Sequence, residues 1–126
     1  MKVREVMTHP VVSLRPQTTV DRAAEVLVSH GFRSAPVRTA EGDVLGIATE
    51  ADLVRDRVVP AAEGTHTVAD VMTPAPLCVG PDEEISEVAL QMLRTGDHSV
   101  LVMEHNRLVG IVTSRDLLSV LAGRAR

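Results

Sequence analysis

The chain is almost free of aromatic residues, with one Phe and no Trp or Tyr among 126 residues. A buried core must therefore be aliphatic, and aromatic platforms for stacking single-stranded bases are missing. The sequence also lacks a basic stretch, and its net charge of -4 with a pI near 5.7 disfavours binding to a polyanion. Nucleic acid is therefore not an expected partner.

Long apolar runs and a leader-type segment are also missing. No apolar run approaches the ~20 residues needed to span a bilayer, and Lys2, Arg4 and Glu5 interrupt the start of the chain with charge. These absences predict a cytoplasmic protein with no membrane partner. The single cysteine, Cys78, predicts neither a disulfide framework nor a thiolate metal site, and we expect it to be a small buried residue.

Residue patterns typical of catalysis are absent as well. Lys2 is the single lysine, and the chain has no phosphate-cradling glycine loop, no His-Glu-x-x-His, no Cys-His pairing and no Gly-x-Ser-x-Gly. The five histidines lack the spacing of metal ligands. The sequence therefore predicts a protein that is not an enzyme, with no catalytic residues, no bound metal and no cofactor.

The chain does contain a copy of itself. The stretch from Val3 to Arg55 recurs from Val68 to Ser119, offset by 65 residues at first and by 64 after one turn. We place the first repeat at 3–59, a glycine- and proline-containing linker at 60–67 and the second repeat at 68–121, within a single module over 1–126. Two separate domains of about 60 residues would each be marginally stable. We therefore expect the repeats to share one core.

Both repeats show the same order of predicted elements. After a short opening stretch, an extended segment precedes apolar residues with the i, i+3, i+4, i+7, i+8 spacing of a helix face, and a glycine follows where that helix ends. Two short apolar runs then predict strands, and a second helix closes the repeat. In the first repeat the extended segment is 11–14, the first helix face is Val20, Ala23, Ala24, Leu27 and Val28, the strands are 34–37 and 44–48, and the closing helix is 50–59. In the second repeat the extended segment is 77–79, the first helix face is Ile85, Val88, Ala89, Met92 and Leu93, the strands are 100–103 and 108–112, and the closing helix is 114–121. The sequence thus predicts an α/β (α+β) fold of two β-α-β-β-α repeats.

A threonine and an aspartate recur where each closing helix begins, as Thr49 and Asp52 and as Thr113 and Asp116. Backbone N–H groups at a helix start favour a phosphate, and an aspartate carboxylate can accept hydrogen bonds from both vicinal hydroxyls of a ribose. The same spacing also fits a capping box, in which the threonine caps the helix and the acid bonds back to it. The pattern leaves both interpretations open.

The residues around the two pairs differ between the repeats. Arg115 could pair with a phosphate whereas its counterpart Ala51 cannot, so the site of Asp116 is predicted to be the better nucleotide site. Gly46 and Gly110 lie in the preceding strands, where the missing side chain would allow close approach of a flat ligand group.

Three motifs occur in order and twice: Val-Met-Thr at 6–8 and 71–73, Ser34–Val37 with its counterpart, and the pair Gly46–Asp52 and Gly110–Asp116. In this order the chain resembles, over nearly its whole length, a tandem pair of cystathionine-beta-synthase (CBS) motifs, also called a Bateman module. The resemblance implies pseudo-twofold packing of the two motifs, with clefts between them that bind adenosine-containing ligands such as AMP, ADP, ATP or S-adenosylmethionine. It also implies that the repeated threonine and aspartate contact phosphate or ribose hydroxyls.

The resemblance assigns further residues to the ligand. It implies polar contacts from Arg33, His98, Thr8 and Thr73, and apolar cover for a base from Val12 and Leu77. The alternative for Arg33 and His98 is a solvated strand end. The alternative for the two threonines is that each caps or ends its short opening helix.

The preferred hypothesis is a regulatory module that binds an adenine nucleotide or another adenosine derivative and responds by a change of conformation or assembly, which requires one arrangement to bind the ligand better. A homodimer and an effector protein are the expected partners. One alternative is an oligomerisation module whose sites are degenerate and whose Thr and Asp residues only cap helices. Another is a regulatory fragment of a larger enzyme or transporter.

Overall fold

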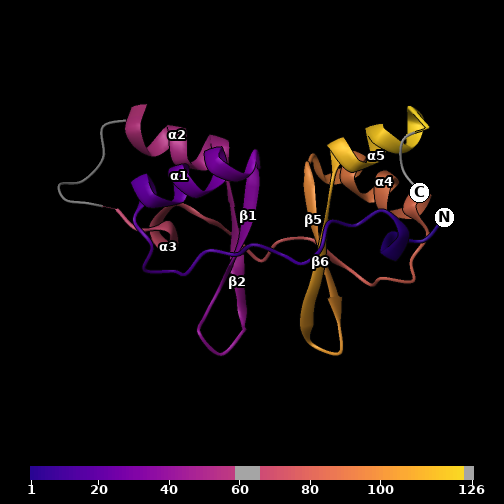
Figure 1. Cartoon of the computed structure of the whole chain (residues 1–126), viewed down its shortest axis with the longest axis horizontal. Helices are drawn as coiled ribbons and strands as arrows, with labels where there is room; N and C mark the ends of the chain where they lie inside the picture. The colour runs from indigo at the N-terminus through magenta and orange to yellow at the C-terminus, as the bar shows by residue number, and fades with distance from the viewer. Residues whose placement is uncertain (59–65, 124–126) are drawn as a thin grey trace. The chain divides into compact units, whose positions relative to one another are not determined.

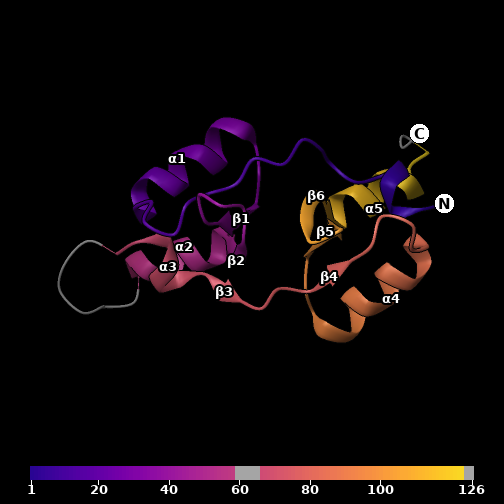
Figure 2. The ribbon, with the colours of Figure 1, turned by 90° about the horizontal axis from the view of Figure 1, so that it is seen from below.

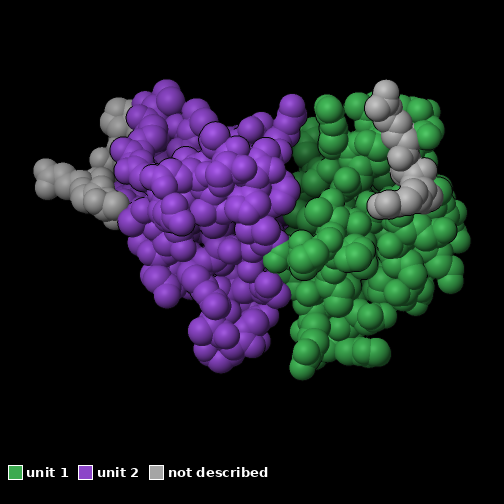
Figure 3. Space-filling view, viewed as in Figure 1, with its two compact units in different colours: residues 1–11, 77–126 green, residues 12–76 purple. Residues whose placement is uncertain are grey.

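The computed structural model describes residues 1–58 and 66–123, which form two compact units. Unit 1 comprises Met1–Val11 and Leu77–Arg126, and unit 2 comprises Val12–Pro76 (Figure 3). The units do not coincide with the repeats. The opening segment of each repeat (residues 3–8 and 68–73) belongs to the unit that is built mainly from the other repeat.

Unit 2 contains two long helices and a three-stranded antiparallel sheet of order β1-β2-β3. Its elements are α1 (Val20–His30), β1 (Ser34–Arg38), β2 (Val44–Thr49), α2 (Glu50–Val58), α3 (Val68–Val71) and β3 (Thr73–Pro74). The helices α1 and α2 contact each other, and the β1-β2 hairpin turn extends away from them (Figure 1). The exchanged opening segment supplies α3 and β3, the third strand of this sheet.

Unit 1 has the same plan. Its elements are η1 (Val3–Glu5), β4 (Cys78–Val79), α4 (Ile85–Thr95), β5 (Ser99–Glu104), β6 (Arg107–Thr113) and α5 (Ser114–Leu121). In its sheet β4 is parallel to β5, and β5 is antiparallel to β6. Figure 2 shows these strands beside α4 and α5. Isolated bridges supply in each unit the strand pairing that is longer in the other. In unit 1, Thr8 pairs with Ile111 of β6, which corresponds to the pairing of β3 with β2 in unit 2. In unit 2, Leu14 pairs with Val37 of β1, which corresponds to the pairing of β4 with β5 in unit 1.

Each unit has its own aliphatic core, so the repeats meet in two cores rather than in the one that we expected. Val68 of the second repeat is fully buried in the core of unit 2, and Val3 of the first repeat is fully buried in the core of unit 1. The other members are Leu14, Val20, Ala23, Leu27, Ala35, Val37, Ala48 and Leu53 in unit 2, and Val79, Val88, Met92, Val100, Val102 and Val112 in unit 1.

Most of the predicted helices and strands are confirmed, including the left-handed glycines after α1 and α4 (Gly31, φ 69°; Gly96, φ 78°). Val28 and Leu93, the last members of the two predicted helix faces, are 81% and 82% exposed. Each ends its series at i+8, about 80° around the helix from the first member, and so lies at the edge of the buried face.

Three further expectations meet different outcomes. Cys78 is exposed, which corrects its expected burial. The predicted helix end at Val59 and most of the predicted linker, residues 60–65, lie outside the described residues. Among residues 1–58 and 66–123, no helix combines the length and the apolar character needed to cross a bilayer.

Candidate functional site

The recurring threonine and aspartate form a capping box in each unit. In unit 2, β2 ends at Thr49, whose N–H donates to Asp52 Oδ2 (3.0 Å) while the Asp52 N–H donates to Thr49 Oγ1 (3.1 Å). In unit 1 the Thr113 N–H donates to Asp116 Oδ2 (2.8 Å), and the Asp116 N–H donates to Thr113 Oγ1 (3.2 Å). These bonds satisfy amides at the start of α2 and α5 that would otherwise lack partners. The structural interpretation of the pattern therefore holds in both units.

The start of α2 offers fewer free N–H groups than the sequence suggested. The Glu50 N–H donates to the Arg33 carbonyl (2.8 Å), and the Asp52 N–H is used by the box. Within the described chain, the Ala51 N–H is then the first-turn amide left without a partner. The expectation that several free amides hold a phosphate is thus corrected to a single amide, and further positive charge has to come from side chains.

The start of α5 is built in the same way but carries a basic side chain. The Ser114 N–H donates to the His98 carbonyl (2.9 Å), which leaves the Arg115 N–H. The Arg115 side chain is exposed, and it forms no ion pair with any residue of the described ranges. Unit 1 can therefore present a guanidinium as well as an amide to an anionic group.

The exchanged opening segment forms the next part of the site in unit 2. The Thr73 hydroxyl donates to Asp52 Oδ2 (3.4 Å), so residues of both repeats meet at this carboxylate. A Cβ on Gly46 would lie 2.5 Å from the Thr73 carbonyl oxygen and 2.9 Å from Met72 Sδ. The missing side chain of Gly46 therefore makes room for the exchanged segment, which corrects our expectation that it makes room for a ligand.

In unit 1 the opening segment takes the equivalent place beside β6. The Thr8 N–H donates to the Ile111 carbonyl (2.9 Å), and the Ile111 N–H donates to the Thr8 carbonyl (3.2 Å). A Cβ on Gly110 would clash with the Met7 side chain. Thr8 is exposed, and among the described residues its hydroxyl forms no hydrogen bond with Asp116.

The two carboxylates differ in burial and in their second oxygen. Asp52 is 8% exposed, and its Oδ1 lies 3.8 Å from Nη1 of Arg55, one helical turn further along α2. Asp116 is half-buried, and its Oδ1 has no partner among the described residues. Ser119, the counterpart of Arg55, bonds instead to the Arg115 carbonyl (3.1 Å). The sequence analysis missed Arg55, although its i+3 spacing from Asp52 could have indicated the pair.

The remaining predicted residues divide between the units. Arg33 and His98 have exposed side chains, and Val12 and Leu77 are half-buried, Leu77 against the core of unit 1. Unit 2 thus contains Val12, Arg33, Thr49, Asp52 and Thr73, and unit 1 contains Thr8, Leu77, His98, Thr113, Arg115 and Asp116. Within the described parts of the chain, His, Cys, Asp and Glu side chains form no group of three that could hold a metal ion.

Comparison with known proteins identifies two CBS domains. The family model for the CBS domain matches residues 3–58 and residues 68–123. Inosine-5'-monophosphate dehydrogenase of Methanocaldococcus jannaschii is 33% identical over 119 residues, which are 93% of this chain and 23% of that protein. The chain spans 42% of the length of one other curated relative and 23% of a second, so these relatives are much longer.

Solved CBS domain pairs match nearly the whole fold. The CBS domain pair of protein MJ0100, in complex with 5-methylthioadenosine and S-adenosyl-L-methionine, has a TM-score of 0.89 and 26% identity, covering 98% of both chains. CBSX2 in complex with AMP has a TM-score of 0.84 and 25% identity, covering 97% of this chain and 96% of that one. Both neighbours therefore bind adenosine-containing small molecules.

Proposed function

Because the chain belongs to the CBS domain family, we propose that it is a regulatory module that binds an adenosine-containing ligand at the Thr/Asp site of each unit. AMP, ADP, ATP and S-adenosylmethionine are the candidates, and the complexes of the two structural neighbours support this class. One observation carries the proposal. Each capping box uses a single carboxylate oxygen, Oδ2, so the other oxygen can accept ribose hydroxyls while the helix stays capped.

Each candidate residue has a role in this proposal. Asp52 and Asp116 accept the ribose hydroxyls, and Arg115 pairs with phosphate in unit 1. The others border the ligand: Thr8, Thr49, Thr73 and Thr113 as hydroxyl partners, Arg33 and His98 as polar neighbours, and Val12 and Leu77 as apolar cover.

The output of the module is a change in conformation or assembly, and the exposed helix faces support a homodimer. Apolar side chains that are more than half exposed lie on the long helices of both units: Val28, Val54 and Val58 on α1 and α2, and Leu93, Leu118 and Leu121 on α4 and α5. Covering such residues with a second copy removes apolar surface from water. An effector protein then binds one of the two ligand-dependent states better than the other.

The proposed function is tested by the small molecule that the protein retains. With no Trp or Tyr, the protein absorbs little near 280 nm, so a bound purine would dominate its near-ultraviolet spectrum. We expect denatured protein to release an adenosine derivative detectable by mass spectrometry, or the folded protein to gain thermal stability with AMP, ADP, ATP or S-adenosylmethionine. A clean supernatant together with no melting shift at millimolar ligand contradicts the proposal.

The second candidate is an assembly module, which the complete capping boxes and exposed apolar faces favour. Asp116→Asn separates the two, because asparagine retains capping ability but removes the charge. Binding of AMP in titration calorimetry should weaken while the unfolding free energy of the apo protein falls by at most about 1 kcal/mol. A large loss of apo stability with unchanged AMP affinity identifies the aspartates as purely structural.

A further inference from the structure

Asp52 is engaged through both of its carboxylate oxygens. Oδ2 accepts from the Thr49 N–H (3.0 Å) and from the Thr73 hydroxyl (3.4 Å), while Oδ1 faces the Arg55 guanidinium at 3.8 Å. A buried carboxylate is stable only with such partners. Any ligand that bonds to Asp52 therefore has to share the carboxylate with them or replace one of them.

Asp116 provides an internal comparison within the same chain. Its Oδ2 accepts from the N–H (2.8 Å) and the hydroxyl (3.1 Å) of Thr113, and its Oδ1 has no partner in the part of the chain that is described. The residue one turn later is Ser119, which carries no charge and donates to the Arg115 carbonyl (3.1 Å). The two sites thus share a capping box and differ in the side chain that competes for the second oxygen.

We propose that Arg55 sets the affinity of the unit 2 site by competing with the ribose hydroxyls for Oδ1 of Asp52. The inference rests on the proposed function. The Arg55 side chain is 69% exposed, so it can move into water when a ligand arrives, and the ligand displaces it instead of being excluded. Since exposed ion pairs are weak and screened by salt, the competition is modest and declines as the ionic strength rises.

The competition predicts an unusual salt dependence. Adenosine carries no charge, and its own contacts with the protein are therefore nearly independent of salt. Its affinity for unit 2 should nevertheless rise with salt, because screening weakens the Arg55–Asp52 pair that adenosine displaces. A purely structural role of Arg55 would produce no such effect.

The test measures adenosine binding by calorimetry in an Asp116→Asn background, which removes the charge of the other site. Arg55→Ser installs the residue found at the equivalent position 119 and should tighten adenosine binding about two- to fivefold. Raising the salt from about 0.05 M to about 0.5 M should tighten binding to the Asp116→Asn protein and leave the Arg55→Ser variant unchanged. Arg55→Gln, which keeps a long side chain without charge, should behave as Arg55→Ser does.

Arg57→Ser is the matched control, because Arg57 lies on the same helix and pairs with Asp21 rather than with Asp52. It should leave adenosine affinity and its salt dependence unchanged. The reciprocal change, Ser119→Arg in an Asp52→Asn background, should weaken adenosine binding to unit 1 and introduce the salt dependence there.

Two outcomes overturn the inference and are distinguishable from each other. If the Asp116→Asn protein binds adenosine and Arg55→Ser leaves the affinity unchanged or weakens it, Arg55 does not compete with the ribose. If neither adenosine nor AMP binds to the unaltered protein or to any variant, the proposed function fails and the inference fails with it.

Discussion

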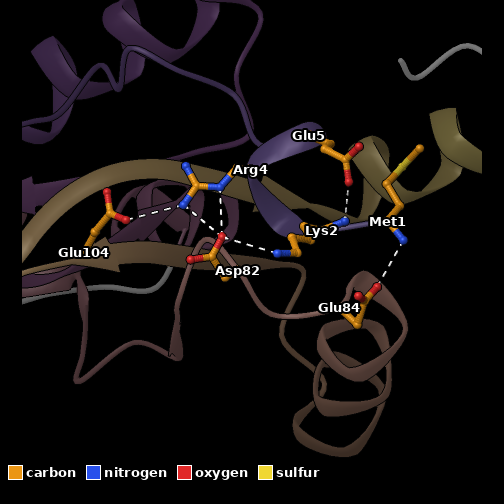
Figure 4. A network of polar contacts seen from close by, with 7 residues as sticks. All are labelled: Met1, Lys2, Arg4, Glu5, Asp82, Glu84 and Glu104. Atoms are coloured by element: carbon orange, nitrogen blue, oxygen red, sulfur yellow. Dashed lines mark hydrogen bonds and ion pairs between the residues drawn. The ribbon is translucent and has the colours of Figure 1, made fainter.

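The opening segments of the two units begin with the same helix-start bond but differ in the ion pairs around it. The Lys2 N–H donates to Glu5 Oε2 (2.6 Å) in unit 1, as the Thr67 N–H donates to Asp70 Oδ2 (2.9 Å) in unit 2. In unit 1, Arg4 Nη2 lies 2.9 Å from Asp82 Oδ1 and 3.4 Å from Glu104 Oε2, and Lys2 and the Met1 amino group add ion pairs to Asp82 and Glu84 (Figure 4). The counterpart of Arg4 in unit 2 is Ala69, which has no charge to pair.

At the start of α3 in unit 2, Thr67 donates twice to the acid, whereas among the described residues Lys2 of unit 1 donates once. The N–H and the hydroxyl of Thr67 both donate to Asp70 Oδ2, at 2.9 Å and 3.1 Å. Beneath these differences, the exchanged segment of each unit buries one valine completely, Val3 in unit 1 and Val68 in unit 2. The comparison indicates that apolar burial fixes the exchanged segment, whereas surface polar contacts determine how its stability responds to salt and acid.

The largest expected effect comes from removing that common anchor. Val3→Ala and Val68→Ala should each lower the free energy of unfolding by about 2 to 3 kcal/mol, through lost burial and the cavity that remains. Hydrogen exchange should quicken mainly in β6 for Val3→Ala and mainly in β2 for Val68→Ala, since those strands pair with the exchanged segments. Equal acceleration in both strands for either variant would contradict the exchange of segments between repeats.

The two strand glycines provide the next contrast between the units. A Cβ at Gly46 meets the backbone carbonyl of Thr73, while a Cβ at Gly110 meets the side chain of Met7, which can rotate away. Gly46→Ala should therefore cost about 2 to 3 kcal/mol of unfolding free energy and Gly110→Ala about 1 kcal/mol, measured by denaturant titration. Adding Met7→Ala to Gly110→Ala relieves the contact with the thioether chain, so it should recover part of the packing strain, and a matching Met72→Ala should not rescue Gly46→Ala.

The exchange itself marks the limit of the sequence analysis. Helix faces, strand pairs and terminal glycines follow from local patterns, and they are confirmed. Val3 and Val68 are equally recognisable as apolar, but the two repeats offer nearly identical sheets for them to pack against. A local pattern cannot distinguish these two surfaces, because the choice depends on how the chain between them is routed.

The candidate site shows the same limit at the level of single atoms. The recurrence of Thr49 and Asp52 as Thr113 and Asp116 indicated two equivalent candidate sites, and the structure shows a capping box at each. The recurrence did not predict which carboxylate oxygen the cap uses, nor that Arg55 faces the other one in a single unit. Those facts depend on side-chain orientation, which spacing alone does not determine.

A smaller effect is expected from the charged network of unit 1. The side-chain hydrogen bond and charge of Asp82 raise the pKa of Arg4. A guanidinium is in any case protonated at every practical pH, so the pairs respond to salt rather than to the titration of Arg4. Arg4→Ala should lower the thermal midpoint at low salt, and the difference from the unaltered protein should shrink as salt screens the exposed pairs. Arg22→Ala, which removes an exposed pair within α1 of unit 2, is the control. An Arg4→Ala effect that persists in high salt would assign Arg4 a packing role instead.

The smallest effect concerns acid and the cap of unit 2. The Thr67 N–H, then the Thr67 hydroxyl, and the charge of His66 favour the ionised carboxylate and lower the pKa of Asp70 below its ordinary value. A lowered pKa in the folded state contributes stability above the pKa of the unfolded chain, and this contribution is lost as the pH falls through the lower, folded value. Asp70→Asn should therefore be less stable than the unaltered protein at pH 7, and the gap in urea midpoint should narrow as the pH drops below about 4. A Thr67→Val background lacks the hydroxyl but keeps the N–H. In this background, the difference in urea midpoint that Asp70→Asn causes should be smaller but still present. A difference between Asp70→Asn and the unaltered protein that stays constant from neutral to strongly acidic pH would show that Asp70 acts without its charge, and the acid sensitivity assigned to unit 2 would then be wrong.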